Sequence, residues 1–154
     1  MRILGPSGGI REMPVEDFIT GPFTTALGRG GEVISEIVIP RLSGTVKSSY
    51  VKLERKAGDF AVVGVAVMLK LSPDGSVEDA SIGITAAGPK PFRAREAEKA
   101  LIGRKLTDDV IEDAAERAMK ESSPISDIRG GSAEYKRAMV KVMTKRAIKN
   151  ALSR

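Results

Sequence analysis

Hydrophobic residues recur with two different periods along this 154-residue chain, and the change between them comes after Pro91. Before Pro91, residues 32–39 and 48–56 partly alternate apolar and polar side chains and are rich in β-branched residues, which is typical of strands. After Pro91, apolar residues recur about every 3.6 positions, which is typical of amphipathic helices. A run of strands followed by a run of helices predicts an α+β fold.

The strands are predicted to form an antiparallel β-meander of three to four strands. Residues 62–71 are a continuous Val-rich run, which indicates a buried strand, with a helix as the alternative. Pro73, Asp74 and Gly75 then form a turn signal, because Pro presets φ, Asp bonds to nearby amides and Gly takes the left-handed position. This turn is expected to pair the Val-rich run with residues 77–85.

Three helices are predicted to follow and to pack on one face of the meander. The first spans residues 93–102 and ends before Gly103, a usual residue just beyond a helix. The second begins after Thr107, whose hydroxyl can accept a bond from a free backbone amide of the first turn. The third covers residues 132–152, with Ser132 as its N-cap.

The last helix carries a basic stripe in which a cation recurs every four residues. The stripe is interpreted as a solvated face or as a contact to a partner protein, and an apolar arc opposite it is expected to pack on the sheet. A net charge of +5 also raises nucleic-acid binding as an alternative, but aromatics make up only 4% of the chain and Trp is absent. We therefore expect no nucleic-acid partner. The stripe is Arg137, Lys141, Lys145 and Lys149, and the apolar arc is Tyr135, Met139, Val142, Met143 and Ala147.

The chain has neither cysteine nor histidine, and this excludes several chemistries at once. A thiol nucleophile, a His-based triad, a structural zinc site and an iron–sulfur cluster carried by this chain are all impossible. No metal site is expected. No apolar run approaches the roughly 18 residues of a membrane span, so no membrane partner is expected and a soluble, cytoplasmic protein is predicted.

Residues 50–61 (YVKLERKAGDFA) place cations and an aromatic ring around one turn. Lys52 and Lys56 are four apart, so on an extended strand they would share a face, and the Gly58-Asp59 turn would bring Phe60 back beside them. A ring next to an ammonium group suits a flat, electron-poor, partly anionic ligand. The alternative is a solvated basic hairpin whose lysines protect a strand edge.

The same segment, extended to residue 66, resembles the opening of the C-terminal domain in FAD-binding medium subunits of molybdenum hydroxylases. This family includes xanthine dehydrogenase and aerobic carbon monoxide dehydrogenase. Three more stretches resemble it in the same order, so the likeness covers nearly the whole chain: VEDFITGPFTTAL at residues 15–27, PFRAREAE at 91–98 and DIRGGSAEYKR at 127–137.

The resemblance implies a division of the chain. Residues 1–30 would be the residual tail of a preceding FAD-binding domain plus a linker, and residues 31–154 the C-terminal α+β domain of the medium subunit. Residues 3–13 are read as a hairpin turning at Gly5–Gly9, followed by a turn at residues 14–18, and Gly28–Gly31 as an interdomain joint. The two glycine-rich phosphate loops of the family are missing from this sequence.

The resemblance also implies the site. Lys52 would neutralise the N1/O2 edge of the isoalloxazine ring of FAD as it is reduced, and Phe60 would cover one ring face. Many relatives have Tyr at the position of Phe60. The Phe60 ring of this chain keeps the stacking surface but lacks the hydroxyl. Asp59 would orient the turn or contact the flavin. Arg55 and Lys56 are weaker candidates and are expected at the surface.

The implied function is one step of an oxidoreductase. In the family, electrons leave a molybdopterin large subunit, cross an iron–sulfur small subunit and reach the FAD of the medium subunit, which passes them to an acceptor. This chain would be the C-terminal part of that medium subunit, with an N-terminal FAD-binding domain as its nearest partner. No catalytic residue is expected, and the chain alone is not expected to be active. The alternative is a flavin-free module for the assembly of subunits.

Overall fold

The computed structural model describes residues 1–28, 30–128 and 130–153 and divides the chain into two compact units, Met1–Leu42 and Ser43–Arg154. The sequence-based division was between residues 30 and 31, and the two compact units divide later in the chain, between residues 42 and 43. The later position follows from strand pairing, since β5 (Val33–Glu36) pairs with β1 (Arg2–Leu4) of the first unit and not with the meander.

The first unit is a small three-stranded antiparallel sheet with an additional hairpin. β1 pairs with β2 (Ile10–Glu12) on one side and with β5 on the other. Gly8, with φ of +82°, makes the predicted hairpin turn between β1 and β2. Cross-strand ion pairs fix the sheet, since Arg2 pairs with Glu12 (2.7 Å) and with Glu36.

A one-turn helix and a short hairpin connect the two halves of this sheet. They are α1 (Val15–Phe18), β3 (Ile19–Gly21) and β4 (Thr24–Thr25). The glycine cluster predicted to be an interdomain joint lies between β4 and β5, inside the first unit, and its Arg29 is outside the described residues. Gly28 donates its backbone N–H to Glu32 at 2.5 Å. The cluster is therefore a connection within the unit.

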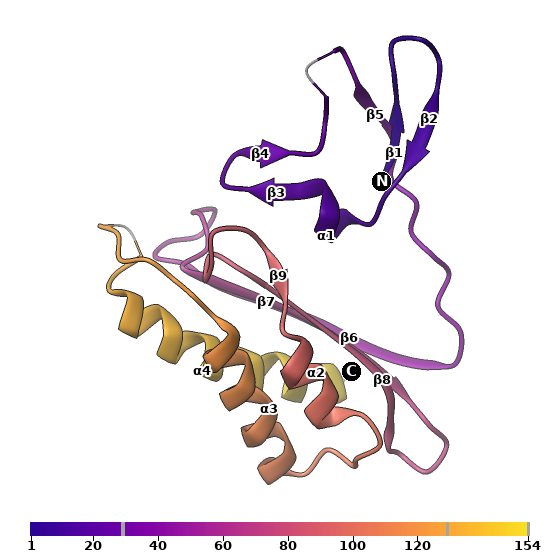
Figure 1. The fold of residues 1–154 in the computed structure, drawn as a ribbon. Helices are drawn as coiled ribbons and strands as arrows, with labels where there is room; N and C mark the ends of the chain where they lie inside the picture. The colour runs from indigo at the N-terminus through magenta and orange to yellow at the C-terminus, as the bar shows by residue number, and fades with distance from the viewer. Residues whose placement is uncertain (29, 129, 154) are drawn as a thin grey trace. The chain divides into compact units, whose positions relative to one another are not determined.

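The second unit has the predicted α+β architecture. Its four strands, β6 (Thr45–Leu53), β7 (Val63–Leu71), β8 (Val77–Thr85) and β9 (Phe92–Arg93), form one antiparallel meander in that order. Figure 1 shows the helices on one side of this sheet: α2 (Arg95–Leu101), α3 (Asp108–Glu121) and α4 (Ala133–Leu152). Both predicted N-caps are confirmed, since Thr107 accepts from Val110 and Ser132 accepts from Tyr135.

The core of this unit lies between the helices and one face of the sheet. On β7, Val63, Val65, Val67 and Leu69 are buried, while Ala66 between them is exposed, so the Val-rich run is a strand with one covered face. α4 packs over β6 and β7, and α2 packs on β8. A buried bond from Ser49 Oγ to the carbonyl oxygen of Ala147 (2.6 Å) joins β6 to α4.

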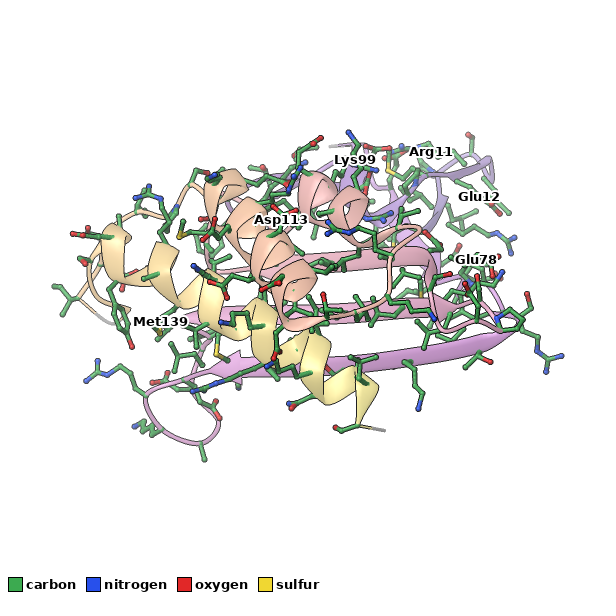
Figure 2. All side chains as sticks on the ribbon, turned by 90° about the horizontal axis from the view of Figure 1, so that it is seen from below. Arg11, Glu12, Glu78, Lys99, Asp113 and Met139 are labelled. Carbon is green, nitrogen blue, oxygen red and sulfur yellow. The ribbon has the colours of Figure 1, made fainter. Side chains whose placement is uncertain are left out.

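The predicted orientation of the last helix is partly wrong. Met143 and Ala147 are buried as expected and Met139, labelled in Figure 2, packs against the core, but Tyr135 is exposed. The helix is rotated toward its basic stripe, and its buried residues are Lys136, Val140, Met143, Thr144, Ala147, Ile148 and Ala151.

The basic stripe forms ion pairs with α3 instead of being simply solvated. Lys141 pairs with Glu112 (2.6 Å) and Glu116 (2.9 Å), Lys145 pairs with Glu112, and Lys149 pairs with Asp108 (2.6 Å). Acidic residues four apart on α3 thus match lysines four apart on α4. These pairs link α3 and α4 along their partly exposed faces.

Candidate functional site

The turn between β6 and β7 brings the three predicted site residues together. Gly58 has φ of +83°, a conformation that side chains other than glycine rarely adopt, and it returns the chain toward β6. Lys52 Nζ donates to the backbone oxygen of Asp59 at 3.1 Å and pairs with Glu54 at 2.5 Å. Asp59 Oδ1 accepts from the backbone N–H of Phe60 at 2.9 Å. The turn is therefore held by its own polar side chains.

Lys52 keeps its positive charge in this setting. The hydrogen bond to Glu54 raises the pKa of the Lys52 ammonium, and this outweighs the partial desolvation that lowers it. A raised pKa on a lysine means that the group stays protonated at neutral pH and above. A positive charge is thus fixed at the base of the turn.

Phe60 is strongly exposed, with 83% of its surface accessible. Its backbone is fixed by Asp59, so the ring is presented from a defined position. Phe60 lies on the rim of a cavity of about 550 Å³, with Arg55 and Asp59 on the same wall. An exposed aromatic ring beside a cavity is a stacking surface for a flat ligand.

The opposite wall of the cavity comes from a second turn, which sequence reasoning matched to the family but gave no role. It includes Asp127, Ile128, Gly130 and Lys136, while Arg129 is outside the described residues. Lys136 is buried; its Nζ donates to Ile125 O at 3.1 Å and to Asp127. Asp127 also accepts from the backbone N–H of Gly130 at 2.5 Å. The sequence does carry a turn signal here, because Asp127, Gly130 and Gly131 come just before the N-cap Ser132. This signal could have predicted a second turn.

Gly130 lies directly against the end of the Lys136 side chain at this second turn. A Cβ at Gly130 would lie 2.4 Å from Lys136 Cε, so a larger residue would displace the flexible end of the lysine from its partners Ile125 and Asp127. The cavity wall therefore combines a buried cation with a glycine packed against it.

The predicted role of Lys56 next to Lys52 is not confirmed. β6 ends at Leu53, so Lys56 lies in the turn and not on the strand, and the alternation that would have placed both lysines on one face does not reach it. Lys56 is exposed, and its carbonyl oxygen accepts from Asp59 N at 3.1 Å. Arg55 is exposed as expected and lines the cavity.

The arrangement can bind and orient a flat ligand. Within residues 1–28, 30–128 and 130–153 there is no group of three or more acidic, His or Cys residues placed to hold a metal ion. In the same parts of the chain, no helix is both long and apolar enough to cross a bilayer. The chemistry on offer is a cavity between two turns, lined by the exposed Phe60 ring and the buried Lys136, with Lys52 anchoring the first turn outside the cavity lining.

Residues 48–151 match the family model of the CO dehydrogenase flavoprotein C-terminal domain, and the chain belongs to this family. The glyceraldehyde dehydrogenase medium chain of Sulfolobus acidocaldarius is 42% identical over 96% of this chain and 51% of its own length. The carbon monoxide dehydrogenase medium chain of Hydrogenophaga pseudoflava is 35% identical over 97% of this chain and 51% of its own.

Solved structures agree with this membership. A carbon monoxide dehydrogenase from Hydrogenophaga pseudoflava, described as lacking the Mo-pyranopterin moiety of its molybdenum cofactor, superposes with a TM-score of 0.92. It is 36% identical, and the match covers 99% of this chain and 52% of that one. Quinoline 2-oxidoreductase from Pseudomonas putida 86 gives a TM-score of 0.86 at 30% identity. The chain thus spans about half the length of each of these relatives.

Proposed function

We propose that this chain is the C-terminal part of the FAD-binding medium subunit of a molybdenum hydroxylase-type oxidoreductase complex. The observation that carries the proposal is the exposed Phe60 ring in a turn that the Lys52 ammonium anchors through the Asp59 carbonyl, in a chain that belongs to a flavoprotein family. Its proposed partners are an N-terminal FAD-binding domain, an iron–sulfur small subunit and a molybdopterin large subunit. The cytoplasm is its proposed location, in keeping with the absence of cysteine.

The residues at the β6–β7 turn fit a flavin. An isoalloxazine is flat and gains negative charge on reduction, so an exposed ring and a fixed ammonium group match its two properties. We assign the stacking contact to Phe60, the charge contact to Lys52 and the orientation of the turn to Asp59. When bound, the flavin supplies the electron transfer to an acceptor, and this chain contributes no acid–base group.

A second candidate function is a flavin-free module for the assembly of subunits. It is favoured by the bonding of Lys52, whose ammonium already has Glu54 and the Asp59 carbonyl as partners without any ligand. In this second function Lys52 only stabilises the turn. A measurement of flavin binding distinguishes the two candidate functions.

The energies predict weak binding of FAD by the chain alone. A stacking contact contributes about 1 kcal/mol and one charge-assisted bond roughly 1.5 to 3, against an association cost of at least about 4 kcal/mol. Isothermal titration of the chain with FAD should therefore give a Kd no tighter than roughly millimolar. Co-production with the N-terminal half of the Sulfolobus medium chain should bring the affinity into the micromolar range.

Substitutions in that complemented protein test the residues. Phe60→Ala and Lys52→Ala should each weaken FAD binding by about fivefold or more, in line with the loss of roughly 1 kcal/mol or more. Lys56→Ala removes the same charge from the same turn and should leave the affinity unchanged. Micromolar binding by the chain alone, or no response to Phe60→Ala after complementation, would refute the proposed site.

A further inference from the structure

Tyr50 lies on the face of the meander opposite the helices, two residues before Lys52 on β6. Ser49 is buried and Val51 packs against the core, so both of these side chains face the helices. Because neighbouring side chains of a strand point to opposite faces, Tyr50 and Lys52 share the other face. Tyr50 is 57% exposed. An aromatic hydroxyl is therefore accessible on the same face as the proposed charge contact.

Gly64 of β7 allows the Tyr50 ring to lie across the sheet toward Lys52. The strand register places Gly64 directly opposite Lys52 and Ala66 opposite Tyr50. A Cβ at Gly64 would lie 3.0 Å from the Tyr50 hydroxyl oxygen and 3.5 Å from Cε2 of the same ring. The φ of Gly64 is not positive, so the missing side chain serves this close approach and not the backbone conformation. The ring leans over the glycine, and its hydroxyl ends beside the residue that faces Lys52.

The Tyr50 hydroxyl is near a positive charge and has a free proton to donate. The pKa of the Lys52 ammonium is raised mainly by the hydrogen bond to Glu54, and Tyr50 adds to the same shift, which requires the two side chains to be close. Within residues 1–28, 30–128 and 130–153 the Tyr50 hydroxyl makes no hydrogen bond. A phenol hydroxyl is both a donor and an acceptor, so this group is available to a ligand.

Building on the proposed function, we infer that Tyr50 is a further flavin-binding residue, whose hydroxyl donates a hydrogen bond to the isoalloxazine edge that Lys52 neutralises. This edge carries oxygen and nitrogen acceptors and gains negative charge on reduction. Hydrogen bonds to charged acceptors are about twice as strong as those to neutral ones, so the Tyr50 contact favours the reduced flavin. Phe60 has no hydroxyl and can only stack. Tyr50 therefore adds an uncharged donor that responds to the state of the flavin.

The cavity of about 550 Å³ between the two turns is the rival location for the same edge. Its wall includes Arg55 and the buried Lys136. The Lys136 ammonium already donates to a backbone oxygen and to Asp127, so it has partners without a ligand. Tyr50 and Lys52 do not line this cavity. The sheet face offers a fixed charge and a free donor together, and we place the edge there.

Tyr50→Phe tests the hydroxyl, because it keeps the ring over Gly64. The variant is measured in the chain co-produced with the N-terminal half of the Sulfolobus acidocaldarius medium chain. Isothermal titration should give about threefold weaker binding of oxidised FAD and, without oxygen, about thirtyfold weaker binding of reduced FAD. The tenfold difference corresponds to a midpoint potential about 30 mV more negative for the two-electron couple. A purely structural role of Tyr50 would leave this potential unchanged.

Ser48→Ala is the matched control, since Ser48 is exposed on the same face of β6 and lies two residues farther from Lys52. It also removes one hydroxyl and should leave both affinities unchanged. The urea midpoint of Tyr50→Phe should stay nearly unchanged, because the hydroxyl has no bond to lose within the chain. Equal affinities for oxidised and reduced FAD losses in Tyr50→Phe, or no loss at all, would overturn the inference. A larger loss of reduced FAD binding in Arg55→Ala than in Tyr50→Phe would place the edge in the cavity and also overturn it.

The variants separate this inference from the proposed function. If Phe60→Ala and Lys52→Ala weaken FAD binding while Tyr50→Phe does not, the flavin site stands and the role of Tyr50 is wrong. If none of the three variants changes FAD binding, the proposed site itself fails. A potential that shifts in Tyr50→Phe and not in Ser48→Ala supports both.

Discussion

Glu98 is the residue whose loss is expected to destabilise the fold most clearly. Its carboxylate is 5% exposed on α2 and accepts from the backbone N–H of Ile82 on β8 at 2.8 Å. It also accepts from Nε and Nη2 of Arg93, both at 2.8 Å. β9 ends at Arg93, so the carboxylate satisfies a β8 amide where the neighbouring strand stops.

The magnitude follows from these three bonds. Glu98→Ala leaves the Ile82 amide without an acceptor, at about 1–3 kcal/mol, and removes two charge-assisted bonds worth roughly 1.5–3 kcal/mol. Arg93 is 37% exposed, so water compensates part of the second loss. We expect a decrease of about 2–4 kcal/mol in the free energy of unfolding. Glu98→Gln keeps an acceptor for Ile82 and should decrease it by about half as much.

Urea denaturation followed by circular dichroism measures these differences. Glu96→Gln is the control, since Glu96 lies on the same helix and its side chain is 54% exposed. The urea midpoint of this variant should stay nearly unchanged. Arg93→Met combined with Glu98→Gln should be less destabilising than the sum of the two single changes, because the two residues interact. Glu98→Ala within about 0.5 kcal/mol of the original protein would refute the role of the carboxylate.

Three further predictions concern other parts of the chain. The pKa of Glu112 is lowered from 4.5 to about 2 by hydrogen bonds from Lys141 and then Lys145, so its stabilisation is present above the unfolded pKa and is lost as the pH falls from about 4.5 toward 2. Glu112→Gln should therefore flatten the acid side of a plot of Tm against pH. Thr144 Oγ1 is buried without a hydrogen-bond partner among the described residues, so Thr144→Val should raise the free energy of unfolding by about 1 kcal/mol in urea denaturation. Limited proteolysis of the chain alone should cut first within residues 37–44, which are exposed and carry no regular structure, and spare residues 63–85.

Each of these predictions has a clear contrary result. If the plot of Tm against pH has the same acid slope in Glu112→Gln as in the original protein, the Glu112 carboxylate titrates normally in the folded state. A loss of stability in Thr144→Val would show that the hydroxyl has a partner. If the protease cuts first inside residues 63–85, residues 37–44 are not the most accessible segment of the chain.

The turn that carries the proposed site was predictable from the sequence because its signals are local. Lys52, Asp59 and Phe60 belong to one turn, and the Gly58 conformation that shapes it depends on the absence of a side chain at that one position. The opposite wall of the cavity was not predictable in the same way. It comes from the turn at residues 127–130, and only packing of α4 against the sheet brings that turn near Phe60.

Local sequence signals were sufficient to predict β6, β7, β8 and the three helices of the second unit in order, whereas β9 was missed because Arg93 was assigned to the first helix. The period of two before Pro91, the period of 3.6 after it, and the caps at Thr107 and Ser132 all depend on neighbours within a few residues. Gly75, with φ of +84°, likewise follows β7 at the predicted turn. Such signals are readable without any tertiary contact.

Long-range contacts were needed to select the sheet that β5 joins and the face that α4 buries. The pattern of β5 predicts a strand but not the strand with which it pairs, which is β1, about 30 residues earlier in the chain. Apolar residues occur on two neighbouring arcs of α4, so either could have been buried. Packing against β6, β7 and α3 decides which arc is buried, and in that orientation Lys141, Lys145 and Lys149 pair with carboxylates of α3.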